Sequence, residues 1–240
     1  AFSYLVYTTS ILKGTVGISP IIINTLYIIV VTLLVACPIG IGGAIYLNEY
    51  AKNKKFVSVI SFTTEVLAGI PSIIYGLFGM LFFGELLKLK FSILTGSFTL
   101  AIMILPIICR NTQVALEGVP KSYREAALGI GATKWYMIRT VLLPSAMPGI
   151  LTGIILGMGR IVAESAALLF TAGSVSVLPT NVFSHLFSSG ATLTIQLYLE
   201  MAKANYETAF VIALVLIVIV LALNFLAKLI SNKFDVNKVK

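Results

Sequence analysis

The sequence predicts an all-α fold, a polytopic transmembrane helix bundle, and two observations lead to that prediction. Of the 240 residues, 58% are hydrophobic and 11% are charged, whereas about a quarter of the residues in a soluble domain are charged. The apolar residues also fall into unbroken runs of Leu, Ile and Val, and about 20 such residues suffice to cross a bilayer. A transmembrane β-barrel would show short alternating segments instead.

Five apolar spans can be recognised along the chain. Some contain helix breakers, namely Pro38, the Gly69-Ile70-Pro71 sequence and Pro106. Membranes tolerate such breaks only where neighbouring protein or a wet cavity satisfies the freed backbone groups. We therefore expect a packed bundle around a pathway. The five predicted spans cover residues 21–47, 56–87, 91–110, 144–171 and 209–230.

Small residues mark the fourth predicted span. Gly149, Gly153 and Gly157 recur at every fourth position, so they line one face of a helix. Such a stripe allows a neighbouring helix to approach closely, and we interpret these glycines as packing residues.

Lysine and arginine set the predicted orientation. When the polar segment 111–143 is placed in the cytoplasm, most basic residues outside the spans fall on that side, as the positive-inside rule requires. Residues 1–20 are then extracytoplasmic, which leads us to expect a sixth helix before residue 1. A transmembrane domain over 21–230 follows, with an external loop over 172–205 and a cytoplasmic tail over 231–240.

Other classes of function are disfavoured by the composition. The net charge is +8, but the basic residues lie between apolar spans rather than on one patch, so no nucleic-acid partner is expected. Cys37 and Cys109 lie within apolar runs and are interpreted as small hydrophobic residues. His185 has no second ligand candidate nearby, so a metal site is not predicted.

The polar segment 118–144 predicts a helix, a glycine turn and a second helix at the membrane surface. Ser122 and Glu125 fit a capping box, which would start the first helix near Ser122. Gly129 and Gly131 would end it, because glycine tolerates the left-handed conformation found at helix ends. The second helix is expected over 132–142.

This segment resembles the EAA loop of ATP-binding cassette (ABC) importer permeases. Glu125-Ala126-Ala127 is followed after three residues by Gly131 and after nine more by Val141-Leu142-Leu143-Pro144. The one departure is Val141, where the family pattern has Ile. The resemblance implies that 118–144 docks into a groove on a separate ATPase subunit, with Glu125, Ala126, Ala127, Gly131, Leu143 and Pro144 as the coupling residues.

Two charged residues occur within the fourth apolar span. Arg160 lies near its middle, and Glu164 follows four residues later, so both would share one helix face and neutralise each other. Intramembrane ionisable residues are usually functional, and a guanidinium suits phosphate oxygens. A structural ion pair remains the alternative. Arg110, at the end of the third span, is read either as a site residue or as an interfacial anchor.

Further segments resemble the A-type permease of the phosphate-specific ABC importer. The resemblance covers most of the chain from about residue 20, and in that family intramembrane arginines at the positions of Arg110 and Arg160 are implicated in phosphate passage. Gln113, where an acidic residue is common, and Ser165-Ala166-Ala167, in place of Thr-Ala-Pro, depart from the pattern. The segments that carry the resemblance are residues 41–50, 68–76, 160–164, 168–172 and 193–198.

The resemblance implies a permease subunit that moves inorganic phosphate across the bacterial inner membrane by alternating access, with Arg160, Glu164 and Arg110 along its path. The implied partners are a second, C-type permease, two ATPase copies, an extracytoplasmic phosphate-binding protein and membrane lipid. No cofactor is expected on this chain, and it is not expected to be an enzyme, since it has no G-x4-GK[ST] loop for ATP.

Three alternatives to a phosphate permease are open on sequence grounds. A related importer for another oxyanion, such as molybdate, sulfate or phosphonate, would share the 118–144 motif. A membrane sensor would be expected to carry a signalling domain, and none is visible in the sequence. An intramembrane hydrolase would need a Ser/His or metal-ligand constellation within the spans, which the sequence does not suggest.

Overall fold

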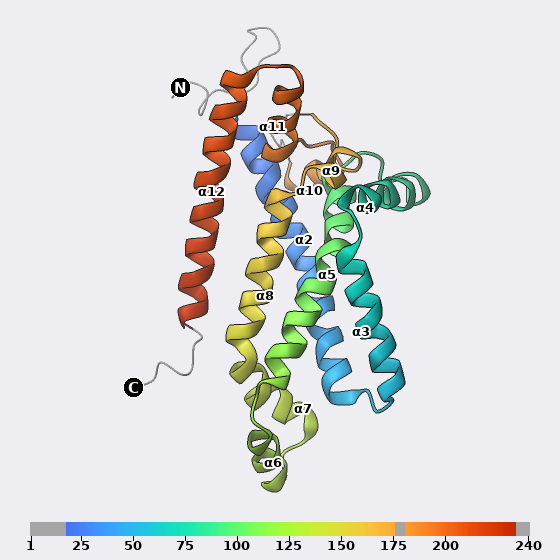
Figure 1. The fold of residues 1–240 in the computed structure, drawn as a ribbon, viewed down its shortest axis with the longest axis vertical. Coiled ribbons are helices and arrows are strands. Elements are labelled where there is room, and N and C mark those ends of the chain that lie inside the picture. The colour runs from blue at the N-terminus through green and yellow to red at the C-terminus, as the bar shows by residue number, and fades with distance from the viewer. Residues whose placement is uncertain (1–17, 176–180, 234–240) are drawn as a thin grey trace. The chain divides into compact units, whose positions relative to one another are not determined.

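The computed structural model describes residues 18–175 and 181–233, and all regular elements in these ranges are helical (Figure 1). The predicted extracytoplasmic segment 1–20 and tail 231–240 lie almost wholly outside the described residues. In chain order the helices, with π-helical stretches labelled η, are α2 (Ser19–Ile45), η2 (Tyr46–Tyr50), α3 (Lys54–Gly69), α4 (Ser72–Gly79), η3 (Met80–Leu86), α5 (Ile93–Glu117), α6 (Lys121–Gly129), α7 (Lys134–Met137), η4 (Ile138–Leu142), α8 (Leu143–Ala163), α9 (Ala166–Leu169), α10 (Val182–Leu186), α11 (Leu193–Ala202) and α12 (Tyr206–Lys233).

The described residues confirm a bundle of apolar helices. Four continuous helical segments are long and apolar enough to cross a membrane, and α3 with α4–η3 forms a fifth candidate only when the two are counted as one bent span. The predicted span 56–87 is thus two helices, because the chain leaves helical conformation at Ile70 and Pro71. The four continuous segments are 19–50, 93–117, 134–163 and 206–231.

Two predicted span ends were wrong. Helix α5 runs seven residues past Arg110 to Glu117, because backbone hydrogen bonding continues after the apolar run has ended. Helix α8 ends at Ala163, eight residues before the predicted end at Thr171. The sequence after Ala163 stays apolar, so hydropathy alone does not mark this helix end.

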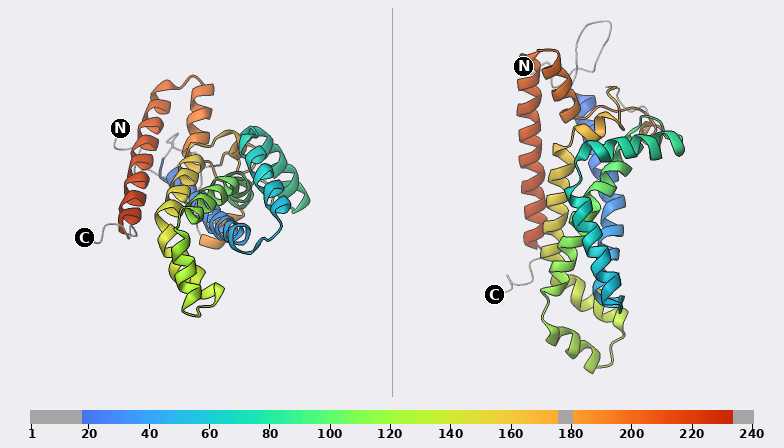
Figure 2. Two further views of the ribbon diagram at one scale, coloured as in Figure 1. Left: turned by 60° about the horizontal axis from the view of Figure 1, so that its bottom comes forward. Right: turned by 45° about the vertical axis from the view of Figure 1, so that its right-hand side comes forward.

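The chain divides into two compact units, each of which is considered by itself. Within the described ranges, the first unit comprises 18–35, 70–103, 158–175 and 181–222. One of its cores joins Ile18, just before α2, and Ile21 of α2 to Leu193 and Ile212. Figures 1 and 2 show α11 followed by the antiparallel start of α12. The Glu200 carboxylate closes that turn, accepting hydrogen bonds from Gln196 at 2.8 Å and from Asn205 at 2.9 Å.

A buried polar cluster in the first unit joins the predicted external loop to α2. His185 Nε2 is 2.7 Å from Asn24 Oδ1, and its Nδ1 is 3.1 Å from the Ser188 hydroxyl. The Tyr27 ring packs edge-on against the imidazole. Burial lowers the pKa of His185 below its ordinary value, because desolvation disfavours the charged imidazolium. This histidine therefore anchors α10 to α2 by hydrogen bonds of its neutral form.

The second unit comprises 36–69, 104–157 and 223–233 of the described residues. One of its cores lies where α5 ends, where α6, α7 and η4 turn, and where α8 begins. Glycines bring α5 and α8 together, as the sequence predicted: a Cβ on Gly149 would lie 2.6 Å from Ala115 Cβ, and one on Gly153 would lie 2.6 Å from Asn111 Cβ. The buried members of the core are Leu116, Val119, Ala127, Met137, Ile138, Leu142, Ala146 and Ile150.

Candidate functional site

Both arginines named from the sequence are exposed on apolar helices. Arg110 belongs to the second unit and lies inside α5, and Arg160 belongs to the first unit and lies in the last turn of α8. Arg160 is thus nearer the end of its helix than the sequence predicted. There the negative end of the helix dipole favours a cation. An exposed arginine on an apolar helix costs free energy if it faces lipid. We therefore expect each of these side chains to face water or another protein subunit.

Glu164 does not pair with Arg160, contrary to the sequence prediction. Because α8 ends at Ala163, the two residues do not share a continuous helix face. The Glu164 carboxylate instead accepts a hydrogen bond from the Ala167 amide at 3.1 Å, and the Glu164 carbonyl accepts one from the Thr194 hydroxyl at 2.8 Å. Glu164 is buried. It therefore fixes the break between α8 and α9 and ties it to α11.

Sequence reasoning missed Tyr75 as a neighbour of Arg160. Tyr75 lies in α4, its side chain is 5% exposed, and it interacts electrostatically with Arg160 within the first unit. The two residues are far apart in sequence, so no local pattern connects them. The one sequence feature that could have drawn attention to Tyr75 is its phenol within an apolar helix. Next to the break, an apolar pocket of 190 Å³ is lined by Ile73, Ser165, Ala166, Leu169, Phe170, Ile195 and Tyr198.

Glu65 is another ionisable side chain that the sequence analysis overlooked. It is exposed on α3, eleven residues after Lys54. At 1.5 Å per residue it stands about 16 Å along the helix, which is about half the thickness of a bilayer core. A single charged residue within an apolar run is the sequence feature that could have identified Glu65. The same feature drew attention to Arg160.

The hairpin over 118–144 has the predicted helix–turn–helix form, with a different start. Pro120 rather than Ser122 caps α6, and no side chain makes a capping bond there, so the predicted capping box is absent. At the other end Gly131 has φ +80°. Ala132 N donates to Ala127 O at 3.1 Å and Gly131 N to Leu128 O at 3.0 Å. This is the Schellman arrangement of helix ends, so the prediction of a glycine-terminated helix is confirmed.

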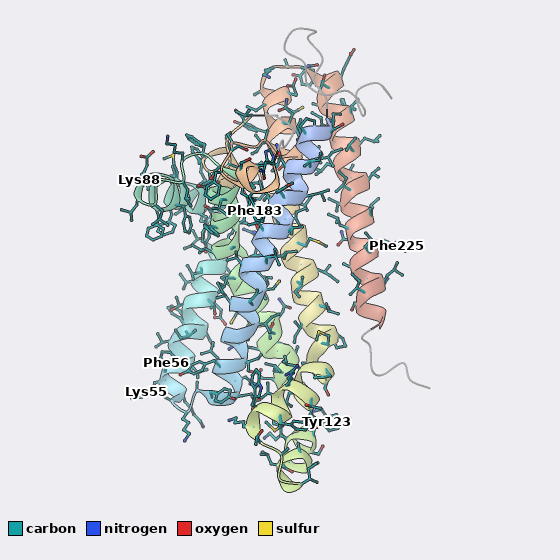
Figure 3. All side chains as sticks on the ribbon, turned by 180° about the vertical axis from the view of Figure 1, so that it is seen from behind. Lys55, Phe56, Lys88, Tyr123, Phe183 and Phe225 are labelled. Atoms are coloured by element: carbon teal, nitrogen blue, oxygen red, sulfur yellow. The ribbon has the colours of Figure 1, made fainter. Side chains whose placement is uncertain are left out.

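The two alanines of the motif have different surroundings. Ala127 is buried in the core of the second unit, whereas Ala126 and Glu125 are exposed. The tip of the hairpin is apolar and exposed, as Figure 3 illustrates for Tyr123. A cluster of large apolar side chains outside the apolar spans is typical of a protein–protein contact. The exposed members are Tyr123, Leu128, Ile130, Trp135 and Tyr136.

These features define a class of protein: an apolar helix bundle with exposed arginines on its apolar helices and a hairpin with an exposed apolar tip. Residues 36–236 match the family described as "Binding-protein-dependent transport system inner membrane component". The chain belongs to this family. It is a permease subunit of an ABC importer in the inner membrane, and ATP hydrolysis belongs to separate subunits.

Individual relatives agree with that membership. The chain is 35% identical over 241 residues to a probable ABC transporter permease protein, YqgI, of Bacillus subtilis, covering 95% of this chain and 82% of that protein. It is 33% identical over 223 residues to the phosphate transport system permease protein PstA of Xylella fastidiosa, covering 90% and 76%. An inward-facing structure of the MetNI methionine ABC transporter shares the fold, with a TM-score of 0.69, 19% identity, and coverage of 91% and 94%.

Proposed function

We propose that this permease conducts inorganic phosphate into the cell by alternating access. The observation that carries the proposal is the exposure of Arg110 and Arg160 on otherwise apolar helices. Facing lipid, each would cost about 2.5–3.5 kcal/mol, so we expect both to face a path shared with a second permease. A guanidinium presents a planar fork of donors that matches the oxygens of an oxyanion.

Other residues support these arginines rather than contact the cargo. Glu164 holds the break after α8 through Ala167 and Thr194, and so positions the helical turn that carries Arg160. Tyr75 is buried in the same unit, where the charge of Arg160 acts on its phenol. The segments resembling the phosphate-specific A-type permease, and relatives named phosphate transport permeases, favour phosphate among oxyanions.

The proposed assembly contains a C-type permease, two ATPase copies and an extracytoplasmic phosphate-binding protein. The exposed apolar tip of the hairpin would enter a groove on the ATPase, with Glu125 and Ala126 facing that groove. Gly131 would fix the angle of the hairpin. Leu143 and Pro144 would pass its movement into α8. We propose that the chain itself needs no cofactor.

A permease for another oxyanion is the second candidate, because a guanidinium would also bind sulfate, molybdate or a phosphonate. The test is uptake of radiolabelled phosphate by cells that lack their own phosphate permeases and express the full transporter. Excess unlabelled sulfate and molybdate are the competitors. Phosphate uptake that resists both competitors supports the proposal. Uptake of a competitor anion in place of phosphate would assign the cargo to the second candidate.

Variants Arg160→Gln and Arg110→Gln test the two arginines within the same assay. Losing charge-assisted hydrogen bonds worth about 1.5–3 kcal/mol each should reduce uptake at least tenfold, while the complex still assembles. Lys55→Gln is the matched control, since Lys55 is an exposed basic residue at the start of α3 (Figure 3). Unchanged phosphate uptake by both arginine variants would remove these residues from the path.

A further inference from the structure

The π-helical end of α2 is tied to both helices of the coupling hairpin. Glu49 lies in η2, and its side chain is 8% exposed. Its Oε1 accepts from Arg124 Nη2 at 3.1 Å and from Arg124 Nε at 3.3 Å. Its backbone carbonyl accepts from the Lys134 ammonium. One residue of η2 therefore contacts α6 through Arg124 and the start of α7 through Lys134, all within the second unit.

The surroundings of these contacts make them directional. Arg124 Nη1 and Nη2 also donate to the carbonyls of Val119 at 2.9 Å and Leu116 at 2.8 Å, at the end of α5. The guanidinium thus makes four hydrogen bonds and bridges three elements. The Lys134 ammonium lies 4.9 Å from the centre of the Tyr50 ring. Charged groups that are largely buried and multiply bonded are far less screened than surface ion pairs.

Chain connectivity alone does not link the hairpin to α2. The hairpin is covalently continuous with α5 and α8, whereas Glu49 and Arg124 are separated by 75 positions in the sequence. A push on the hairpin would therefore reach α2 only through side-chain contacts. The local π-helix is a further sign of a special role, since such stretches are frequent at functional sites. In η2 it is closed by the Ala51 amide donating to the Tyr46 carbonyl at 2.9 Å.

We propose that Glu49 is a positioning residue that locks the coupling hairpin to α2, so that movement driven by the ATPase is passed to α2 as well as to α5 and α8. The proposal rests on the proposed docking of residues 118–144 onto the ATPase. Glu49→Gln keeps the shape of the side chain and removes its charge. It leaves the Lys134 contact intact, because that contact is made to the Glu49 carbonyl.

The first test is independent of the cargo. Spin labels at positions 52 and 122, both exposed, report the distance between the end of η2 and α6 in the assembled transporter. Cys37 and Cys109 are replaced by alanine beforehand. If Glu49 holds the hairpin to α2, the unmodified protein should show the same distance distribution with and without ATP. In Glu49→Gln, ATP should shift or broaden that distribution. An ATP-dependent shift of equal size in both proteins would overturn the proposal.

The second test separates coupling from stability. In vesicles containing the complete transporter, Glu49→Gln should hydrolyse ATP normally while phosphate moved per ATP falls about fivefold or more, the usual scale of an allosteric coupling. Lys134→Gln should act in the same direction, and Lys52→Gln, an exposed lysine beyond η2, is the matched control. A parallel loss of hydrolysis and transport, or unchanged transport per ATP, would reduce Glu49 to a structural residue. Failure of the unmodified transporter to move phosphate would instead count against the proposed cargo, and the spin-label test would still decide on the lock.

Discussion

The glycine stripe of α8 provides a perturbation whose size can be worked out from the structure. In Gly153→Ala the new Cβ would lie 2.6 Å from the Cβ of Asn111 on α5. Carbon atoms pack at about 3.5–4.0 Å, so the two helices must separate by about 1 Å or distort. Asn111 has little freedom to move away, because its side-chain amide donates to the Ile107 carbonyl at 2.8 Å.

The expected cost is that of overpacking a closely packed contact, about 1–3 kcal/mol of unfolding free energy. Alanine has the higher helix propensity, by about 1 kcal/mol, so the net loss would be about 0–2 kcal/mol, and Gly153→Ala would be stabilising if the helices could yield freely. The assay is thermal unfolding of the purified transporter in detergent, followed by the exposure of buried thiols such as Cys109, which is 4% exposed.

Gly159→Ala is the matched control in the same helix, because a Cβ there meets nothing within 4 Å in the described structure. It should leave the melting temperature unchanged or raise it, whereas Gly153→Ala should lower it by several degrees. Equal melting temperatures for the two variants would refute the close contact between α5 and α8.

Two further predictions concern buried polar groups. Glu164→Gln should retain stability, because an amide oxygen still accepts from Ala167, whereas Glu164→Ala should cost about 1–3 kcal/mol by leaving that amide unsatisfied; equal unfolding temperatures for the two variants would contradict the capping role. His185, whose pKa burial lowers, stays neutral in the native state while the unfolded chain takes up a proton below about pH 6.5. Stability should therefore be constant above that pH and fall below it, and His185→Gln should flatten the acid limb of a stability-versus-pH curve; an unchanged limb would contradict the assignment.

The sequence could predict those features of the structure that short sequence patterns determine. The turn at Gly131 follows from the need for a positive φ, and the close contact of α8 follows from glycines spaced by four. The end of α8 could not be predicted, because an apolar sequence continues past Ala163 and neither glycine nor proline marks the helix end. An i,i+4 pairing of Arg160 with Glu164 was therefore inferred on a helix that stops between them.

Contacts between residues far apart in the sequence could likewise not be predicted from the sequence. Glu49 was visible only as part of a segment resembling a known family, and its partner Arg124 was visible only as part of the hairpin. Tyr75 and Arg160 come from different helices. The spacing of the motif also cannot show which of its two alanines is buried. Ala126 is exposed, whereas Ala127 packs into the core of its own chain.

The most direct test of the central claim is the water accessibility of position 160. In a transporter lacking other cysteines, Arg160→Cys and Leu214→Cys would be treated with a charged, membrane-impermeant thiol reagent applied from either side. Leu214 is 64% exposed on the apolar helix α12 and is expected to face lipid. We expect labelling at position 160 and none at position 214. Labelling of both positions only by a lipid-soluble maleimide would contradict it, because Arg160 would then face the bilayer and not a path for phosphate.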